Sequence, residues 1–465
     1  MSSLQDTLDR IPDLVDYFYN DTVAPHAMHR ADLVPVPPEF TNWRDEQRAW
    51  RQTAVLFDQS HHMPELFLSG PDALRLLKTV GINNFENVAP DRAKQLVGCA
   101  YDGHVIGESV AYCNAEDSFE LVSGMTLQNW VHYLAETLDY DVTVERDLNT
   151  SDNPTGRRVN FRYQLDGPNA AQIFREVVEG EVPDIPFFRT ARIRIMGCDV
   201  LALRHGMAGH FGVELSGAYD DGDIIRAAIV KAGADHGMRE GGSRAYFSAK
   251  AESGWIPYPL PAIYTDERMR AFREWLPADG WEARQQLGGS FRSADIEDYY
   301  VTPWDLGLGH LLHLDHDFIG REALVELADA EPRAKVTLVW DKDDAMQVQR
   351  SLLEEGIPYK YLGLPIASYS FQHTDQVLDG DRLVGVATFT GYTVNESDIL
   401  SLAIVDASHA EPGTKVSLIW GEPDGGSRKP HVELHRQVTV SATVAPAPYA
   451  QAVRQFKAGA GKSSS

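Results

Sequence analysis

The chain has 465 residues, 43% hydrophobic and 24% charged, which is typical of a folded globular protein of about three domains. Its formal net charge of −26 repels nucleic-acid backbones and anionic membranes, so neither is expected as a partner. A solubility strategy or a salty habitat explains that charge at least as well as a specific function does. Cys99, Cys113 and Cys198 form no CxxC pair, so neither a disulfide framework nor a zinc site is expected.

The chain carries no targeting signal that we can identify. Residues 1–21 are polar and acidic and lack the basic and apolar segments of a signal peptide. No stretch approaches the ~18 to 20 apolar residues of a membrane span. We therefore expect a cytoplasmic protein, and no obligate protein partner is evident.

Hydrophobic periodicity predicts alternating helices and short strands up to about residue 330. Helices are expected over 45–55, 70–80, 126–138, 169–178 and 221–233. Strands are expected within 54–69, 96–112, 118–122, 139–145, 157–165 and 188–214. On the 221–233 helix, the buried face is expected to hold Ile224, Ile225, Ala228 and Ile229. Hairpins mixed with isolated helices favour an α+β fold over a doubly wound sheet.

Short strands dominate after about residue 330. They are expected over 335–340, 382–389, 400–405, 415–420 and 437–444, with Gly and Asp at the turns between them. The pattern predicts an all-β domain of barrel or sandwich type over 331–465, after a larger module over 1–330.

The first notable motif runs from Arg204 to Glu214. A predicted strand ends at Leu203, three glycines follow, and a carboxylate lies on the next strand. Glycines let a backbone approach a flat ligand, and the Glu214 carboxylate could accept two parallel hydrogen bonds from a 2-amino-4-oxo heterocycle. The spacing alone favours a plain glycine-rich hairpin with a surface glutamate.

Two further segments contain candidate site residues. The segment 243–263 is rich in aromatic residues and proline, so Tyr246 and Trp255 could stack on rings, although a packed core fits the same pattern. In Gln59–His62, one histidine could transfer a proton near neutral pH, although structural histidines fit equally. Adjacent histidines point in different directions, and we expect no metal. No nucleophile elbow, Walker loop or dinucleotide fingerprint is present.

These motifs resemble a known family. Gly206–Glu214 and the DFIGREAL segment at 317–324 resemble the T-protein of the glycine cleavage system. Longer segments resemble the tetrahydrofolate-dependent aromatic O-demethylases and the related sesamin-metabolising methylene transferase; they are 38–50, 56–63, 242–265, 288–303, 389–392 and 444–449. The resemblance implies two interleaved α+β lobes and a C-terminal β domain around a central folate cavity.

The resemblance also implies which residues form the folate half of the site. Tetrahydrofolate is the expected acceptor of the one-carbon group. Glu214 matches the carboxylate that holds the pterin, and Tyr246, Trp255 and Gln164 match residues that line the folate. Tyr246 is also a catalytic candidate, because a leaving phenolate needs a proton donor.

The part of the site that binds the aryl substrate is expected to differ from that of the vanillate enzymes. Gln59, His61 and His62 match contacts to the aryl substrate, with His62 the second candidate proton donor. Those enzymes place an arginine for the substrate carboxylate where this chain has Gly124, and a tyrosine where it has Leu33. Without the charge-assisted hydrogen bonds of that arginine, a neutral and bulkier aromatic substrate is favoured over a benzoate.

A methylenedioxyphenyl lignan such as sesamin is therefore the preferred small aromatic substrate, giving a catechol and 5,10-methylene-tetrahydrofolate. Demethylation of vanillate or syringate to give 5-methyl-tetrahydrofolate is the alternative. His104–Glu108 replaces the paired aspartates of the T-proteins, which argues against glycine cleavage. A non-catalytic folate-binding accessory protein is a further alternative, but its cysteine motif does not match the sequence around Cys99.

Overall fold

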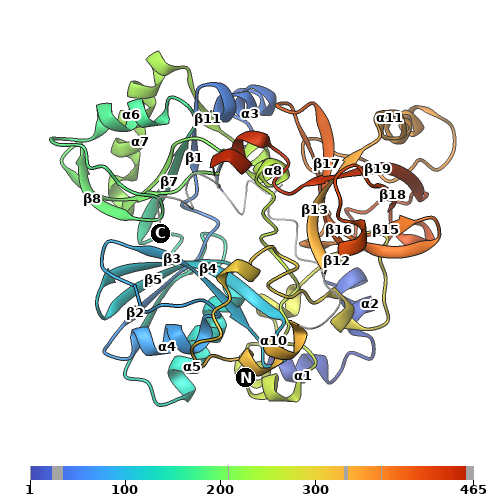
Figure 1. Ribbon diagram of the computed structural model, residues 1–465, viewed down its shortest axis with the longest axis horizontal. Helices are drawn as coiled ribbons and strands as arrows, with labels where there is room; N and C mark the ends of the chain where they lie inside the picture. The colour runs from blue at the N-terminus through green and yellow to red at the C-terminus, as the bar shows by residue number, and fades with distance from the viewer. Residues whose placement is uncertain (1, 23–34, 208, 329–332, 368, 457–465) are drawn as a thin grey trace.

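The computed structural model describes residues 2–22, 35–207, 209–328, 333–367 and 369–456. Two sheets and a barrel surround the middle of the molecule (Figure 1). Leu33 and the predicted domain boundary at 330/331 lie outside the described residues. Within the described part of the chain, no helix is long and apolar enough to cross a membrane.

The first sheet has six strands in the order β11-β1-β7-β10-β9-β8. Their bounds are β1 Ala54–Asp58, β7 Asn160–Asp166, β8 Thr190–Ile195, β9 Cys198–Arg204, β10 Gly212–Ala218 and β11 Met238–Gly241. Helices α6 (Ala170–Val177) and α7 (Gly222–Gly233) pack against one face with apolar side chains of β7, β9 and β10. One face of this sheet is therefore an apolar core, which leaves the other free to carry polar groups.

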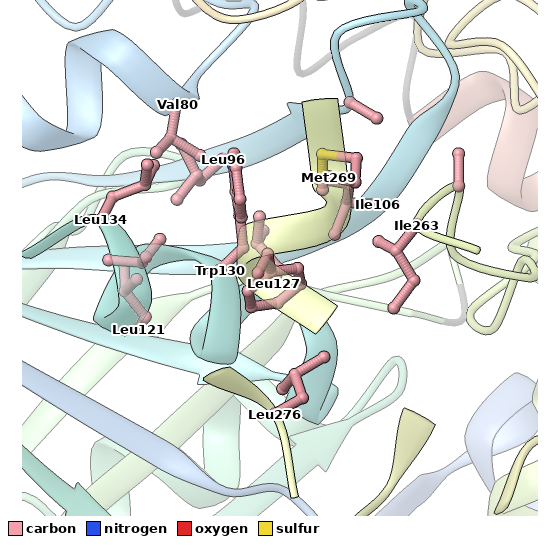
Figure 2. Packing of buried hydrophobic residues seen from close by; sticks show 14 of the residues in the cluster. Val80, Leu96, Ile106, Leu121, Leu127, Trp130, Leu134, Ile263, Met269 and Leu276 are labelled. Carbon is pink, nitrogen blue, oxygen red and sulfur yellow. The ribbon is translucent and has the colours of Figure 1, made fainter. Parts of the chain in front are cut away.

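The second sheet is built entirely from the segment between β1 and β7, so the two lobes are interleaved as expected. Its strand order is β3-β4-β5-β2-β6. The bounds are β2 Glu65–Ser69, β3 Ala93–Cys99, β4 Val105–Ala115, β5 Ser118–Ser123 and β6 Thr143–Asp147, with α4 at Ala73–Val80 and α5 at Met125–Thr137. Leu127, Trp130 and Leu134 of α5 join Leu96 and Leu121 of the sheet in one apolar cluster (Figure 2).

The C-terminal domain is a closed barrel in the order β13-β17-β16-β15-β18-β19. Its strands are β13 Arg333–Trp340, β15 Asp375–Asp379, β16 Arg382–Thr393, β17 Asp398–Asp406, β18 Lys415–Trp420 and β19 Val438–Pro446. Helix α11 (Lys342–Arg350) follows β13, and Asp341 caps it by accepting hydrogen bonds from two backbone N–H groups. A two-stranded pairing of β12 (Leu287–Gly288) with β14 (Gln372–His373) joins the barrel to the preceding segment.

Helix α8 (Ser243–Ser253) lies between the first lobe and the barrel (Figure 1). It packs against α3 (Trp43–Gln52) on one side and β16 on the other. Glu252 accepts hydrogen bonds from Trp50 of α3 at 3.1 Å and from Thr393 of β16 at 2.5 Å. Gly254, in the left-handed conformation at φ 69°, ends the helix. These contacts fix α8 at the centre of the protein.

Short helices complete the described part of the chain. α1 (Leu4–Leu8) packs against α9 (Arg270–Trp275), which also contacts α5, and α2 (Leu14–Asn20) packs against β12. α10 (Arg321–Leu327) begins in the DFIGREAL segment. Single 3-10 turns lie at 219–221, 234–236, 267–269, 282–284, 296–299, 309–311, 351–353, 407–409 and 423–425.

Three sequence predictions need correction. The helix expected over 45–55 ends at Gln52, because Ala54 and Val55 form β1 beside β7 and β11. Ile224 is 44% exposed rather than buried, since the apolar face of α7 is narrower than expected. The domain expected to be all-β also contains α11, and the strand β15 was not predicted.

Candidate functional site

Strand β7 carries a buried polar row on the face opposite its apolar core. Arg162, Gln164 and Asp166 alternate with Phe161, Tyr163 and Leu165, and all six side chains are buried. Side chains alternate between the faces of a strand, so the three polar groups share one face. Gln164 pairs with Glu214 on β10, which adds a carboxylate to the same face. The sheet thus presents hydrogen-bonding groups toward the centre of the protein.

Arg162 holds three carboxylates from three different strands. Its guanidinium lies 2.9 Å from Glu65 of β2 and 2.6 Å from Glu120 of β5, and it also bonds Glu214. Tyr112 of β4 donates its hydroxyl hydrogen to Glu214. Burial raises the pKa of Glu120 to about 7, although Arg162 opposes this shift. Arg162 thereby joins the two lobes and fixes one oxygen of Glu214, and no sequence motif indicated this role.

The buried acceptor atoms of this face fit the N–H edge of a pterin. Among the described residues, Gln59 Oε1, Gln164 Oε1 and Asp166 Oδ1 are buried without a hydrogen-bond partner. A buried acceptor without a donor is costly, so an N–H-rich ligand would stabilise them. Glu214 is 8% exposed and lies in the same row. Glu214 and Gln164, the two residues that the resemblance assigns to the folate, are therefore neighbours on this face.

The glycines of the 204–214 segment serve the turn itself, the role that the spacing alone favoured. A Cβ on Gly212 would lie 1.9 Å from Asp166 Oδ1, and a Cβ on Gly206 would lie 2.8 Å from the carbonyl oxygen of His210. Gly209 (φ 78°) packs against the backbone of Ala452. The glycines thus make room for the turn itself and for Asp166, rather than for a ligand.

Replacing Asp166 with asparagine is expected to stabilise the protein at pH 8 by roughly 2–4 kcal/mol and to stabilise it clearly less at pH 5. Burial raises the pKa of Asp166 to about 7. The native state therefore retains a proton that the unfolded state loses above pH 4, and stability falls as the pH rises toward 7. Urea denaturation of both proteins at the two pH values measures the difference. An equal effect at both would contradict the buried, proton-binding carboxyl group.

Tyr246 of α8 forms a hydrogen-bonded group with Gln59 and His62. Its hydroxyl oxygen lies 3.2 Å from Gln59 Nε2 and 3.2 Å from His62 Nε2. The Tyr246 ring also packs edge-on against Phe57 of β1, with centroids 5.2 Å apart. The segment after β1 and the first turn of α8 thus bring these three predicted residues together. With Gln59 and His62 both donating to the oxygen, the Tyr246 O–H could point at a substrate.

Both proton-transfer candidates are neutral at physiological pH. Burial raises the pKa of Tyr246 far above its usual value, and the nearby charges of Glu214 and Asp166 raise it further. Burial lowers the pKa of His62 to about 3, and the positive charges of Arg158 and Lys250 add to this effect. The pair therefore offers a neutral phenol and a neutral imidazole.

Three other predicted site residues do not join the hydrogen-bonded group of Tyr246, Gln59 and His62. His61 turns away from it, because its Nδ1 lies 2.9 Å from Thr150 Oγ1. Trp255 is 43% exposed and donates its N–H to Glu108, and within the described residues no contact joins it to Tyr246. Gly124 borders Tyr258, since a Cβ on Gly124 would lie 4.0 Å from Tyr258 Cε1.

A cavity opens between the C-terminal part of α8, the segment after it and the barrel. Lys250, Tyr258, Phe371, His373 and Phe389 are among its lining residues. Tyr246 does not itself line the cavity, but Lys250 lies one helical turn after it, and Tyr258 is close enough to help raise its pKa. Sequence reasoning missed Lys250 and His373. The only available signal was a lysine four residues after Tyr246 in a segment otherwise rich in aromatic residues and alanine.

The comparisons with known proteins agree with this geometry. Residues 18–262 match the family model described as the GCVT N-terminal domain. The chain is 43% identical to a syringate O-demethylase from Sphingobium sp. SYK-6 over 97% of both proteins. It is 30% identical to a sesamin methylene transferase from Sinomonas sp. No.22, covering 86% of this chain and 89% of the relative.

A solved structure shows the same fold. The glycine cleavage system aminomethyltransferase T from Bartonella henselae superposes with a TM-score of 0.61 at 16% identity, covering 90% of this chain and 92% of that one. The predicted α+β fold with a C-terminal barrel is thereby confirmed. The similarity to named enzymes over nearly the whole chain excludes the non-catalytic alternative. The chain belongs to the GCVT family of tetrahydrofolate-dependent one-carbon transferases.

Proposed function

We propose that this enzyme is an O-demethylase that moves the methyl group of a methoxylated aromatic acid, of the syringate type, to tetrahydrofolate. The products are the corresponding phenol and 5-methyl-tetrahydrofolate. The observation that carries the proposal is the partly buried Tyr246 hydroxyl, 3.2 Å from both Gln59 and His62, on the helix that also carries Lys250 of the aromatic cavity. The 43% identity to a syringate O-demethylase supports the class of methyl donor.

The chemistry requires a proton for the leaving oxygen. Bound tetrahydrofolate supplies the N5 amine that accepts the methyl group. The methyl–oxygen bond breaks with its electron pair on oxygen, and Tyr246 donates a proton to the forming phenolate. His62 Nε2, 3.2 Å away, and Gln59 orient the hydroxyl and stabilise its oxygen as the proton leaves. The proton lost from the amine balances the proton gained by the phenolate, so no oxidant or reductant is needed.

Glu214 and Gln164 would hold the pterin on the β7 face. Arg162 and Tyr112 occupy one oxygen of Glu214, which orients the carboxylate before any ligand binds. Preorganised partners lower the entropic cost of aligning the two reactants. These side chains therefore position the acceptor, and Tyr246 stands on the donor side.

A methylenedioxyphenyl donor, preferred on the sequence alone, is the second candidate. The 30% identical sesamin methylene transferase favours it, and so does Gly124, which leaves space beside Tyr258 for a bulky neutral ring. Such a donor would yield a catechol and 5,10-methylene-tetrahydrofolate. The greater identity to the syringate enzyme leads us to place the methoxy donor first.

Incubation with tetrahydrofolate and one of syringate, vanillate or sesamin tests this order. We expect consumption of syringate, with the corresponding phenol as product, and no consumption of sesamin. Turnover of sesamin without turnover of either acid would overturn the proposal in favour of the second candidate. Chromatography of the aromatic products, with a folate-free reaction as the control, gives the answer.

A further inference from the structure

A buried lysine lies in the wall of the aromatic cavity, close to the proposed reaction centre. Lys250 is 6% exposed, and its Nζ lies 5.1 Å from the ring centroid of Tyr258, 5.4 Å from Phe247 and 5.7 Å from Phe389. It follows Tyr246 by four residues on α8, so the two side chains emerge from the same face of the helix, with Cβ atoms about 5–6 Å apart.

The surroundings of Lys250 favour an anionic ligand. Burial lowers the pKa of Lys250 to about 7, so its charged form is held at a cost. The three aromatic faces recover part of that cost through cation–π attraction. A carboxylate bound in the cavity would add a charge-assisted hydrogen bond to Lys250, and such a bond is strong where water is excluded.

Lys250 borders the same ring as Gly124. A Cβ on Gly124 would lie 4.0 Å from Tyr258 Cε1, and Lys250 Nζ lies 5.1 Å from the centroid of that ring. A cation on α8 therefore lies beside the same ring as the start of α5.

We propose that Lys250 binds the carboxylate of the aryl substrate and so selects aromatic acids over neutral aromatics, an inference that rests on the proposed O-demethylase function. The proposal reverses the expectation that the loss of the arginine at Gly124 implies a neutral substrate. The glutamate tail of folate is another source of a carboxylate. The aromatic lining of the cavity favours the aryl acid, since a flat ring fills such a space and the flexible tail does not.

Direct binding tests the inference without any turnover. Calorimetric titration with syringate and with its methyl ester, in the absence of folate, compares the charged and neutral forms of one ring. Lys250→Met is expected to weaken syringate binding about tenfold to a hundredfold and to leave the ester unchanged. Lys250→Arg is expected to retain most of the preference for the acid. Lys429→Met is a matched control, because Lys429 is also buried, with a pKa lowered to about 7, but does not line the cavity.

Equal weakening of acid and ester in Lys250→Met, or no weakening of either, would overturn the inference. A loss of tetrahydrofolate affinity, with binding of truncated tetrahydropteroate and of syringate unchanged, would overturn it by assigning Lys250 to the folate tail. A failure of the proposed O-demethylase function would give a different result. The protein would still bind syringate more tightly than its ester, but no 5-methyl-tetrahydrofolate would form from syringate.

Discussion

Replacing Arg162 with methionine is expected to lower the free energy of unfolding by about 3–5 kcal/mol, the usual cost of removing one partner from a buried ion pair. Glu65, Glu120 and Glu214 would remain buried around an apolar side chain without their common cation. The loss should be larger at pH 8 than at pH 5, because protonation at the lower pH relieves unpaired buried carboxylates. Urea denaturation at the two pH values measures both effects.

Arg157→Met provides the matched control on the same segment. Arg157 pairs with Asp220 at the surface, where both side chains are more than half exposed. Removing such a pair is expected to change stability by less than about 1 kcal/mol. If the two variants lost similar stability, the three-carboxylate cluster would not be the link between the lobes that its contacts indicate.

Replacing Tyr246 with phenylalanine is expected to lower the rate of methyl transfer about 10²- to 10⁴-fold, the usual range for removing a general acid. The ring and its packing against Phe57 remain, so the affinities for folate and for the aryl substrate should change little. Only the proton for the leaving phenolate is lost. Single-turnover kinetics with bound tetrahydrofolate separates this step from binding and product release.

Tyr163→Phe is the control for loss of a buried tyrosine hydroxyl. Tyr163 lies on β7 but faces the apolar core with α6 and α7. Its variant should retain the wild-type rate of transfer. An unchanged rate in Tyr246→Phe would remove Tyr246 from proton transfer and leave His62 as the candidate.

Local sequence patterns predicted most of the elements because their periodicity reflects burial on one face. The hairpin at 93–123 and α5 follow this rule closely. The prediction failed where the local signal ended. Ala54 and Val55 were expected both in the helix over 45–55 and in the strand segment 54–69, and they form β1, which pairs with strands more than 100 residues away. α11 is polar, and Asp341 is its main sequence signal.

The candidate site was predictable only where the family resemblance reached it. Gln59, His62 and Tyr246 were expected near one another, and the structure brings their polar atoms within hydrogen-bonding distance. The cluster around Arg162 could not be predicted, because its partners come from β2, β5 and β10 and no spacing connects them. Lys250 carries no motif, and its importance depends on a cavity that forms only when α8 meets the barrel.

Transfer of an intact methyl group from an aryl ether to folate is the central claim, and isotopic labelling tests it most directly. The enzyme would be incubated with unlabelled tetrahydrofolate and with syringate that carries trideuterated methoxy groups. Mass spectrometry would then give the mass of the folate product. The account predicts 5-methyl-tetrahydrofolate that retains all three deuterium atoms. Unlabelled folate, or a product at the methylene level with only two deuterium atoms, would contradict it.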